Sequence, residues 1–164
     1  MPKVYTARQI AEYFLAKVDE EEGDQISNLK LQKLCYYAQG IGIVARVEPM
    51  FPEQIEAWLH GPVVPDLYRH YRPNGANGIP AISNLDLDAY DVADRMVLDD
   101  VFDFYGQYSA SRLRQMTHQE APWKDAYADD GNAVITNEAL RAYFANEVND
   151  EYCRKYAEIS GGGS

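Results

Sequence analysis

The chain has 164 residues, with 15 Lys or Arg against 26 Asp or Glu, and a formal net charge of −11. This acidic balance argues against direct nucleic-acid binding, because neutralising phosphates requires clustered positive charge. Hydrophobic residues make up 46% of the sequence and aromatic residues 12%, which excludes the composition of a disordered chain. The length suits one domain, which we expect to span residues 1–160.

The two cysteines, Cys35 and Cys153, lie far apart and form no C-x-x-C pair. They predict neither a disulfide framework nor a four-ligand zinc site. The sequence has no signal peptide and no apolar run of about 18 residues, so we expect a cytoplasmic protein that does not enter a membrane. Residues 161–164, Gly-Gly-Gly-Ser, are typical of a flexible tail or a remnant of cloning.

Hydrophobic spacing predicts helices over most of the chain. Thr6 and Gln9 form a capping box before a helix over residues 7–18, and Ser27 caps a longer helix that reaches Ala45 with one apolar stripe. Residues 19–24, between these helices, carry five acidic side chains and predict a solvated loop. Later helices are expected over residues 86–105, about 110–117, in a turn opened by Pro122 and Trp123, and from Thr136 or Asn137 through Tyr156.

The segment over residues 48–71 differs from these helical regions in composition. Four prolines between residues 48 and 71 exclude a long helix, and the spacing of its apolar residues predicts a short strand or hairpin. Pro65 is suited to begin a short helix, and the Asn-Gly pairs in residues 74–78 predict a surface loop. We therefore expect a mainly α fold: a single compact helical domain with a small extended or hairpin insert around residues 50–62.

Two short patterns typical of catalysis lack the context that their chemistry needs. Residues 40–45 match G-x-G-x-x-A, but they follow a helical stripe instead of opening a helix after a strand, which favours close helix packing over dinucleotide binding. Ser27 and Lys30 match S-x-x-K, but the companion motifs of serine acylases are missing, so Ser27 is better explained as a helix cap.

The sequence also gives little support for a metal site or for a catalytic cysteine. His60, His70 and His118 show no metal-ligand spacing, and the Asp-rich face within residues 86–103 lacks a calcium-binding loop. Cys35 falls in the apolar stripe, where a thiol is usually inert, although a Cys–His dyad stays open from sequence alone. We therefore predict no catalytic residue, no cofactor and no metal.

Three stretches carry a more specific signal: LKLQKLCYYAQG at residues 29–40, EAWLHGPVVPDLY at 56–68, and THQEAPW at 117–123. Their order, spacing and identity resemble the Panacea antitoxin domain, a family that includes GepA-like prophage proteins and SocA-like proteolytic adaptors. The resemblance extends over about residues 5–145.

The resemblance implies an antitoxin, not an enzyme, that neutralises a cognate protein toxin encoded nearby through direct stoichiometric binding. The alternative it implies is a SocA-like adaptor that delivers a bound toxin to a cytoplasmic protease. An enzyme ranks behind both. Most motif residues are apolar or turn-forming and are expected to build the fold: Leu31, Leu34, Tyr36, Trp58, Gly61, Pro62, Val63, Pro65, Tyr68, His118, Pro122 and Trp123.

Lys30, Lys33 and Tyr37 are predicted to form the partner-facing surface. Their spacing places them on one side of the second helix, away from the apolar stripe. The two lysines also oppose the helix dipole, a local cost that a purely structural role leaves unexplained. The rival explanation is internal pairing of the lysines with residues 19–24 or with Glu56.

Overall fold

The computed structural model describes residues 2–18, 25–129 and 131–161. Its elements in chain order are α1 (Ala7–Ala16), α2 (Asn28–Ala45), β1 (Ile55–Trp58), β2 (Gly61–Val63), α3 (Pro65–Tyr71), the 3-10 turns η2 (Arg72–Asn74) and η3 (Leu87–Ala89), α4 (Val92–Tyr105), α5 (Ala110–His118), α6 (Ala121–Asp129), β3 (Val134–Ile135), α7 (Asn137–Phe144) and α8 (Asp150–Gly161). The predicted mainly α fold with a small extended insert is confirmed. Within these residues, no helix is both long and apolar enough to cross a membrane.

Two predicted segments fall at the limits of this description. The acidic loop expected at residues 19–24 lies outside the described residues. Of the expected tail, residues 162–164 also lie outside them, whereas Gly161 is the last residue of α8.

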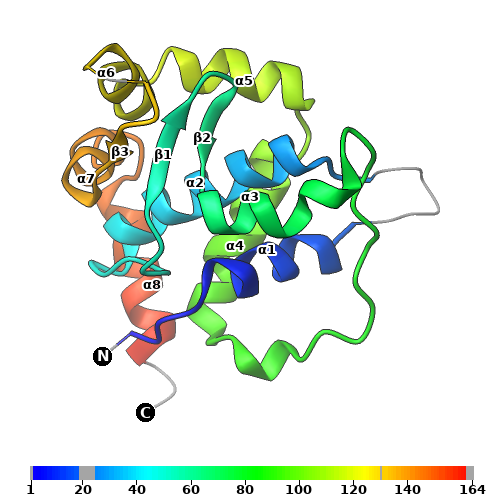
Figure 1. Ribbon diagram of the computed structural model, residues 1–164. Helices are drawn as coiled ribbons and strands as arrows, with labels where there is room; N and C mark the ends of the chain where they lie inside the picture. The colour runs from blue at the N-terminus through cyan, green and yellow to red at the C-terminus, as the bar shows by residue number, and fades with distance from the viewer. Residues whose placement is uncertain (1, 19–24, 130, 162–164) are drawn as a thin grey trace.

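Helix α2 is the central element of the fold. It contacts α1, α3, α4, α5, α7, α8 and β2, which surround it in Figure 1. Every residue from 31 to 40 is buried as a result, including Gln32, Lys33 and Gln39. The predicted apolar stripe of α2 is buried, except for the half-buried Ile41, but neighbouring elements also cover the other sides of the helix, so its polar positions become interior.

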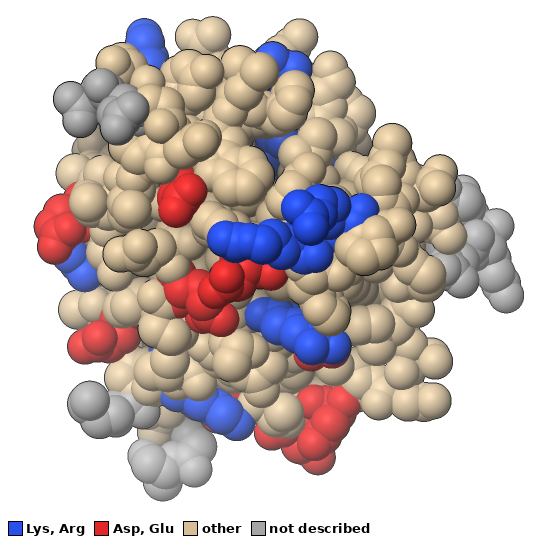
Figure 2. Space-filling view, viewed as in Figure 1, with Lys and Arg blue, Asp and Glu red and all other residues tan. Residues whose placement is uncertain are grey.

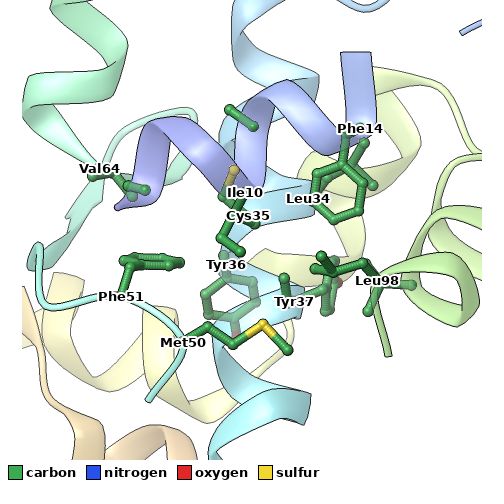
Figure 3. Packing of buried hydrophobic residues seen from close by; sticks show 14 of the residues in the cluster. Ile10, Phe14, Leu34, Cys35, Tyr36, Tyr37, Met50, Phe51, Val64 and Leu98 are labelled. Carbon is green, nitrogen blue, oxygen red and sulfur yellow. The ribbon is translucent and has the colours of Figure 1, made fainter. Parts of the chain in front are cut away.

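The hydrophobic core lies on both sides of the α1–α2 contact. Figure 3 shows Ile10 and Phe14 of α1 beside Leu34 and Cys35 of α2. All four side chains are fully buried. Met50, Phe51 and Val64, from the segments on either side of the hairpin, pack against the same core. Contacts between segments distant in the sequence thus fix α2 in place.

The glycines of the G-x-G-x-x-A pattern serve helix packing, as predicted. A Cβ atom on Gly40 would lie 2.2 Å from the Phe144 ring of α7, and one on Gly42 would lie 2.8 Å from Met50 Cγ. Both glycines lie inside α2, where they permit this close approach.

The small sheet has the order β2-β1-β3 and is antiparallel throughout. The predicted hairpin is confirmed, with Ala57 paired to Pro62, while β3, which pairs Ile135 with Ile55, has only two residues and was not predicted. Gly61 has φ +126°, a conformation that L side chains rarely adopt. The hairpin can therefore turn back toward α2 at this glycine.

Two predicted helix boundaries are corrected. The helix expected over residues 86–105 begins only at Val92, because η3 and the loop around Tyr90 come first and Tyr90 Oη donates to Gln9 O over 2.6 Å. The helix expected from Thr136 through Tyr156 is two helices, α7 and α8. Thr136 caps α7, and Asn149 Oδ1 accepts a hydrogen bond from Tyr152 N at the start of α8.

Candidate functional site

The three quoted sequence stretches meet at one place, where α2, the β1–β2 hairpin and the α5–α6 junction pack together. We call these residues the motif cluster. Gln32 Oε1 accepts a hydrogen bond from Val64 N over 3.0 Å, joining α2 to the end of the hairpin. Trp123 Nε1 donates to Trp58 O over 2.8 Å, joining α6 to β1. The motifs are thus connected by hydrogen bonds within the fold.

Glu120 lies at the centre of the motif cluster and is nearly buried. Its carboxylate accepts hydrogen bonds from both tyrosines of α2, Tyr36 Oη at 2.9 Å and Tyr37 Oη at 2.8 Å. Burial raises the pKa of Glu120 to about 7, although the two tyrosine hydrogen bonds act in the opposite direction. Sequence reasoning missed this residue, although it is the lone acidic position in THQEAPW.

Tyr37 contacts both the Glu120 carboxylate and the ring of Tyr105. Its ring stacks on Tyr105 at the end of α4, with the ring centroids 3.7 Å apart and an interplanar angle of 6°. Tyr105 is half-buried, whereas Tyr37 is fully buried. Tyr37 therefore contacts both Glu120 and Tyr105, and Tyr105 is the most exposed of the three.

Aromatic rings fasten the outer part of the motif cluster. Trp123 lies between His118, with centroids 3.8 Å apart, and Tyr127, with centroids 4.7 Å apart. Trp123 is 7% exposed, whereas Trp58 is half-buried and packs edge-on against Tyr68. The remaining residues predicted to build the fold are buried or half-buried: Leu31, Leu34, Tyr36, Gly61, Pro62, Val63, Pro65 and Pro122.

The predicted partner-facing surface requires Lys30, Lys33 and Tyr37 to be exposed, and two of these three residues are buried. Lys33 is 1% exposed and Tyr37 is 0% exposed, because β2, α5 and α4 cover the side of α2 that the sequence left apparently free. Only Lys30 is half-buried, and its Nζ donates to Gly106 O over 2.7 Å. The side chains of Lys33 and Tyr37 are interior and offer a partner no surface.

Lys33 is buried next to the hairpin turn. Its Nζ donates to Leu29 O over 3.2 Å, and a Cβ atom on Gly61 would lie 2.9 Å from its Cε. Burial, followed by the charge of Arg114, lowers the pKa of Lys33 to about 8. The rival partner Glu56 accepts instead from Trp58 Nε1 over 2.9 Å.

A second buried polar cluster lies where α8 and the N-terminal segment meet α4. Asp94 Oδ2 accepts from Tyr5 Oη and Asp94 Oδ1 from Tyr156 Oη, each over 2.6 Å. Arg46 lies 3.2 Å from the same carboxylate, and the side chains of both Arg46 and Asp94 are 0% exposed. Arg46 also donates to Lys3 O. This cluster joins α2, α4, α8 and the N-terminal segment.

The residues considered for catalysis have structural roles. Ser27 Oγ accepts a hydrogen bond from Lys30 N and caps α2. Cys35 is completely buried, and burial raises the pKa of its thiol far above the usual range. Among the described residues, no group of three or more His, Cys, Asp and Glu side chains is arranged to hold a metal ion.

Comparison with known proteins identifies the family of the chain. Residues 31–124, which include most of the motif cluster, match the family described as antitoxin SocA-like, Panacea domain. The chain therefore belongs to the SocA-like Panacea family of antitoxins. It is also 33% identical over 138 residues to Antitoxin SocA of Caulobacter vibrioides, an alignment that covers 74% of this chain and 70% of the relative. No solved structure matches the chain.

Proposed function

We propose that the chain neutralises a cognate protein toxin encoded beside it, by direct and stoichiometric binding. Family membership carries the proposal, because the family consists of antitoxins and is not typically enzymatic. The side chains of the motif cluster support it: Glu120, Gln32 and Trp123 make hydrogen bonds within the fold. Their role is to build a scaffold whose outer surface meets the partner.

The charge of the chain supports a protein partner with a basic surface. Toxins that act on RNA need positive charge to hold phosphates, and a partner with net charge −11 is steered onto such a surface and covers it. On the face shown in Figure 2, Lys and Arg side chains gather near the centre beside Asp and Glu side chains.

The test is co-expression with the product of each neighbouring reading frame. We expect one neighbour to arrest growth when expressed alone, and this chain to restore growth and co-purify with that product. Failure of every neighbour to be toxic or to bind would overturn the proposal. Repeating the rescue in cells that lack the cytoplasmic ATP-dependent proteases separates the two modes: an inhibitor still protects, whereas an adaptor does not.

A further inference from the structure

A groove lies between α4 and the α7–α8 turn, outside the motif cluster. We call it the α4–α8 groove. Its volume is about 320 Å³. That is the size of a small ligand pocket, typically about 300 Å³ or more, and leaves room for an anchoring side chain. Its lining residues are Ile41, Asp100, Val101, Phe104, Tyr105, Glu147, Val148, Asn149 and Tyr152.

The groove exposes aromatic surface. Phe104 is 52% exposed although it is a large hydrophobic residue. Its ring packs edge-on against Tyr105, with centroids 4.8 Å apart, and against Tyr108 at 5.9 Å. A ring fixed by its neighbours loses little conformational freedom on binding, and aromatic anchors of this kind dominate the energetics of protein interfaces.

The charged side chains that line the groove are both acidic. Asp100 and Glu147 contribute carboxylates, and the exposed Asp103 precedes Phe104 on the same helix. Tyr152 Oη donates to Asp100 Oδ2 over 2.8 Å, which positions that carboxylate beside the groove. An apolar floor with an acidic rim is complementary to an apolar side chain flanked by Lys or Arg.

From this complementarity we infer that the α4–α8 groove is the docking site for the toxin, and that it receives an amphipathic toxin segment with an apolar anchor and flanking basic residues. The inference rests on the proposed function and deepens it. A second copy of this chain fits poorly, because a symmetric contact through the groove would bring two acidic rims together.

The groove is continuous with the motif cluster, which gives the buried motifs a role in binding. Tyr105 lines the groove and also stacks on Tyr37, which donates to Glu120. Ile41 of α2 also lines the groove. The motif residues therefore hold the groove in shape without contacting the toxin themselves.

The experiment uses the adjacent gene product that the co-expression screen identifies as toxic, and measures its Kd for variants of this chain. Phe104→Ser removes the anchor, and the double variant Asp103→Lys with Glu147→Lys, which we call the rim variant, reverses the charge of one lining carboxylate and of the exposed carboxylate beside Phe104. Val92→Ser, which alters a residue 62% exposed at the other end of α4, is the control for the first. Asp88→Lys with Glu138→Lys makes the same charge change at exposed positions outside the groove and is the control for the second.

We expect each groove variant to weaken binding at least tenfold and to lose growth rescue, while the controls stay within threefold of wild type. Circular dichroism melting confirms that each variant is folded, and the rim variant alters only exposed side chains. If the wild type binds and rescues while groove variants match their controls, the docking site is wrong and the antitoxin function stands. If no neighbouring product is toxic and bound, both fail. A dimer of this chain that Phe104→Ser dissociates would assign the groove to a second copy and overturn the inference.

Discussion

At the residue scale, Lys33 shows how strongly the surroundings of α2 change the properties of a side chain. A lysine pKa lowered from 10.5 to about 8 means that the folded state binds this proton more weakly than the unfolded state. The stability cost of the buried charge is therefore fully present below pH 8 and fades as the pH rises through about 8–10. Lys33 thus opposes folding at neutral pH.

We predict that Lys33→Met is at least as stable as wild type at pH 7, with a free energy of unfolding up to about 3 kcal/mol higher. The apolar isostere keeps the packing against Gly61 and removes the desolvated charge. Urea denaturation at pH 7 and at pH 9 measures this, with the exposed Lys155→Met as control. A loss of stability at pH 7 would show that the hydrogen bond to Leu29 O outweighs the burial cost.

Glu120 gives the second prediction at this scale. Its pKa is raised from 4.5 to about 7, so the folded state holds the proton more tightly and stability is lost as the pH rises from about 4.5 to about 7. We expect Glu120→Gln to be more stable than wild type at pH 8, by on the order of 2–3 kcal/mol, and nearly equal at pH 4, below the unfolded pKa. Chemical denaturation across this range tests it against the exposed Glu138→Gln. A constant difference at all pH values would contradict the assigned cause.

At the element scale, Asp94 holds α8 and the N-terminal segment against α4. Replacing it by Ala leaves the Arg46 guanidinium buried without its partner, which we expect to cost about 3–5 kcal/mol. Tyr156→Phe removes one hydrogen bond to the carboxylate and should cost about 1.5–3 kcal/mol. Hydrogen exchange should show α8 opening before α2 in both variants. Loss of less than 1 kcal/mol in Asp94→Ala would mean that α8 docks mainly through apolar contacts.

Trp123 fastens α6 to the hairpin, and its replacement by Ala should cost about 3–5 kcal/mol. Trp58 is half-buried, so Trp58→Ala should cost less, about 1–3 kcal/mol. Thermal melting measures this difference, and we expect a lower Tm for Trp123→Ala than for Trp58→Ala. A Trp123→Ala protein with unchanged Tm but abolished toxin binding would place the indole in the interface instead.

At the scale of the whole molecule, the sequence predicts local features well and the surroundings of each element poorly. The caps at Thr6, Ser27 and Thr136, and the hairpin before Pro65, follow from short-range chemistry and are confirmed. The hydrophobic periodicity of a helix does not indicate how many other elements pack around it, so the sequence does not predict that Lys33 and Tyr37 are buried. The pairing of Glu120 with Tyr36 joins positions 84 residues apart, which no local pattern reveals.

The same limit applies to the α4–α8 groove. Ile41, Phe104 and Val148 come from three distant segments, and each alone is an ordinary apolar residue in a helical pattern. Only the fold brings them together with Asp100 and Glu147. The family motifs indicate what kind of protein this is, while the docking surface that we infer lies almost entirely outside them.

A titration with purified components tests whether neutralisation is stoichiometric binding. Increasing amounts of this chain are added to the cognate toxin with no protease present, while toxin activity and bound fraction are measured together. We predict that activity falls in proportion to complex formation and reaches its minimum at one equivalent. Toxin that stays fully active while saturated with this chain would show that binding alone does not neutralise it, and would favour delivery to a protease.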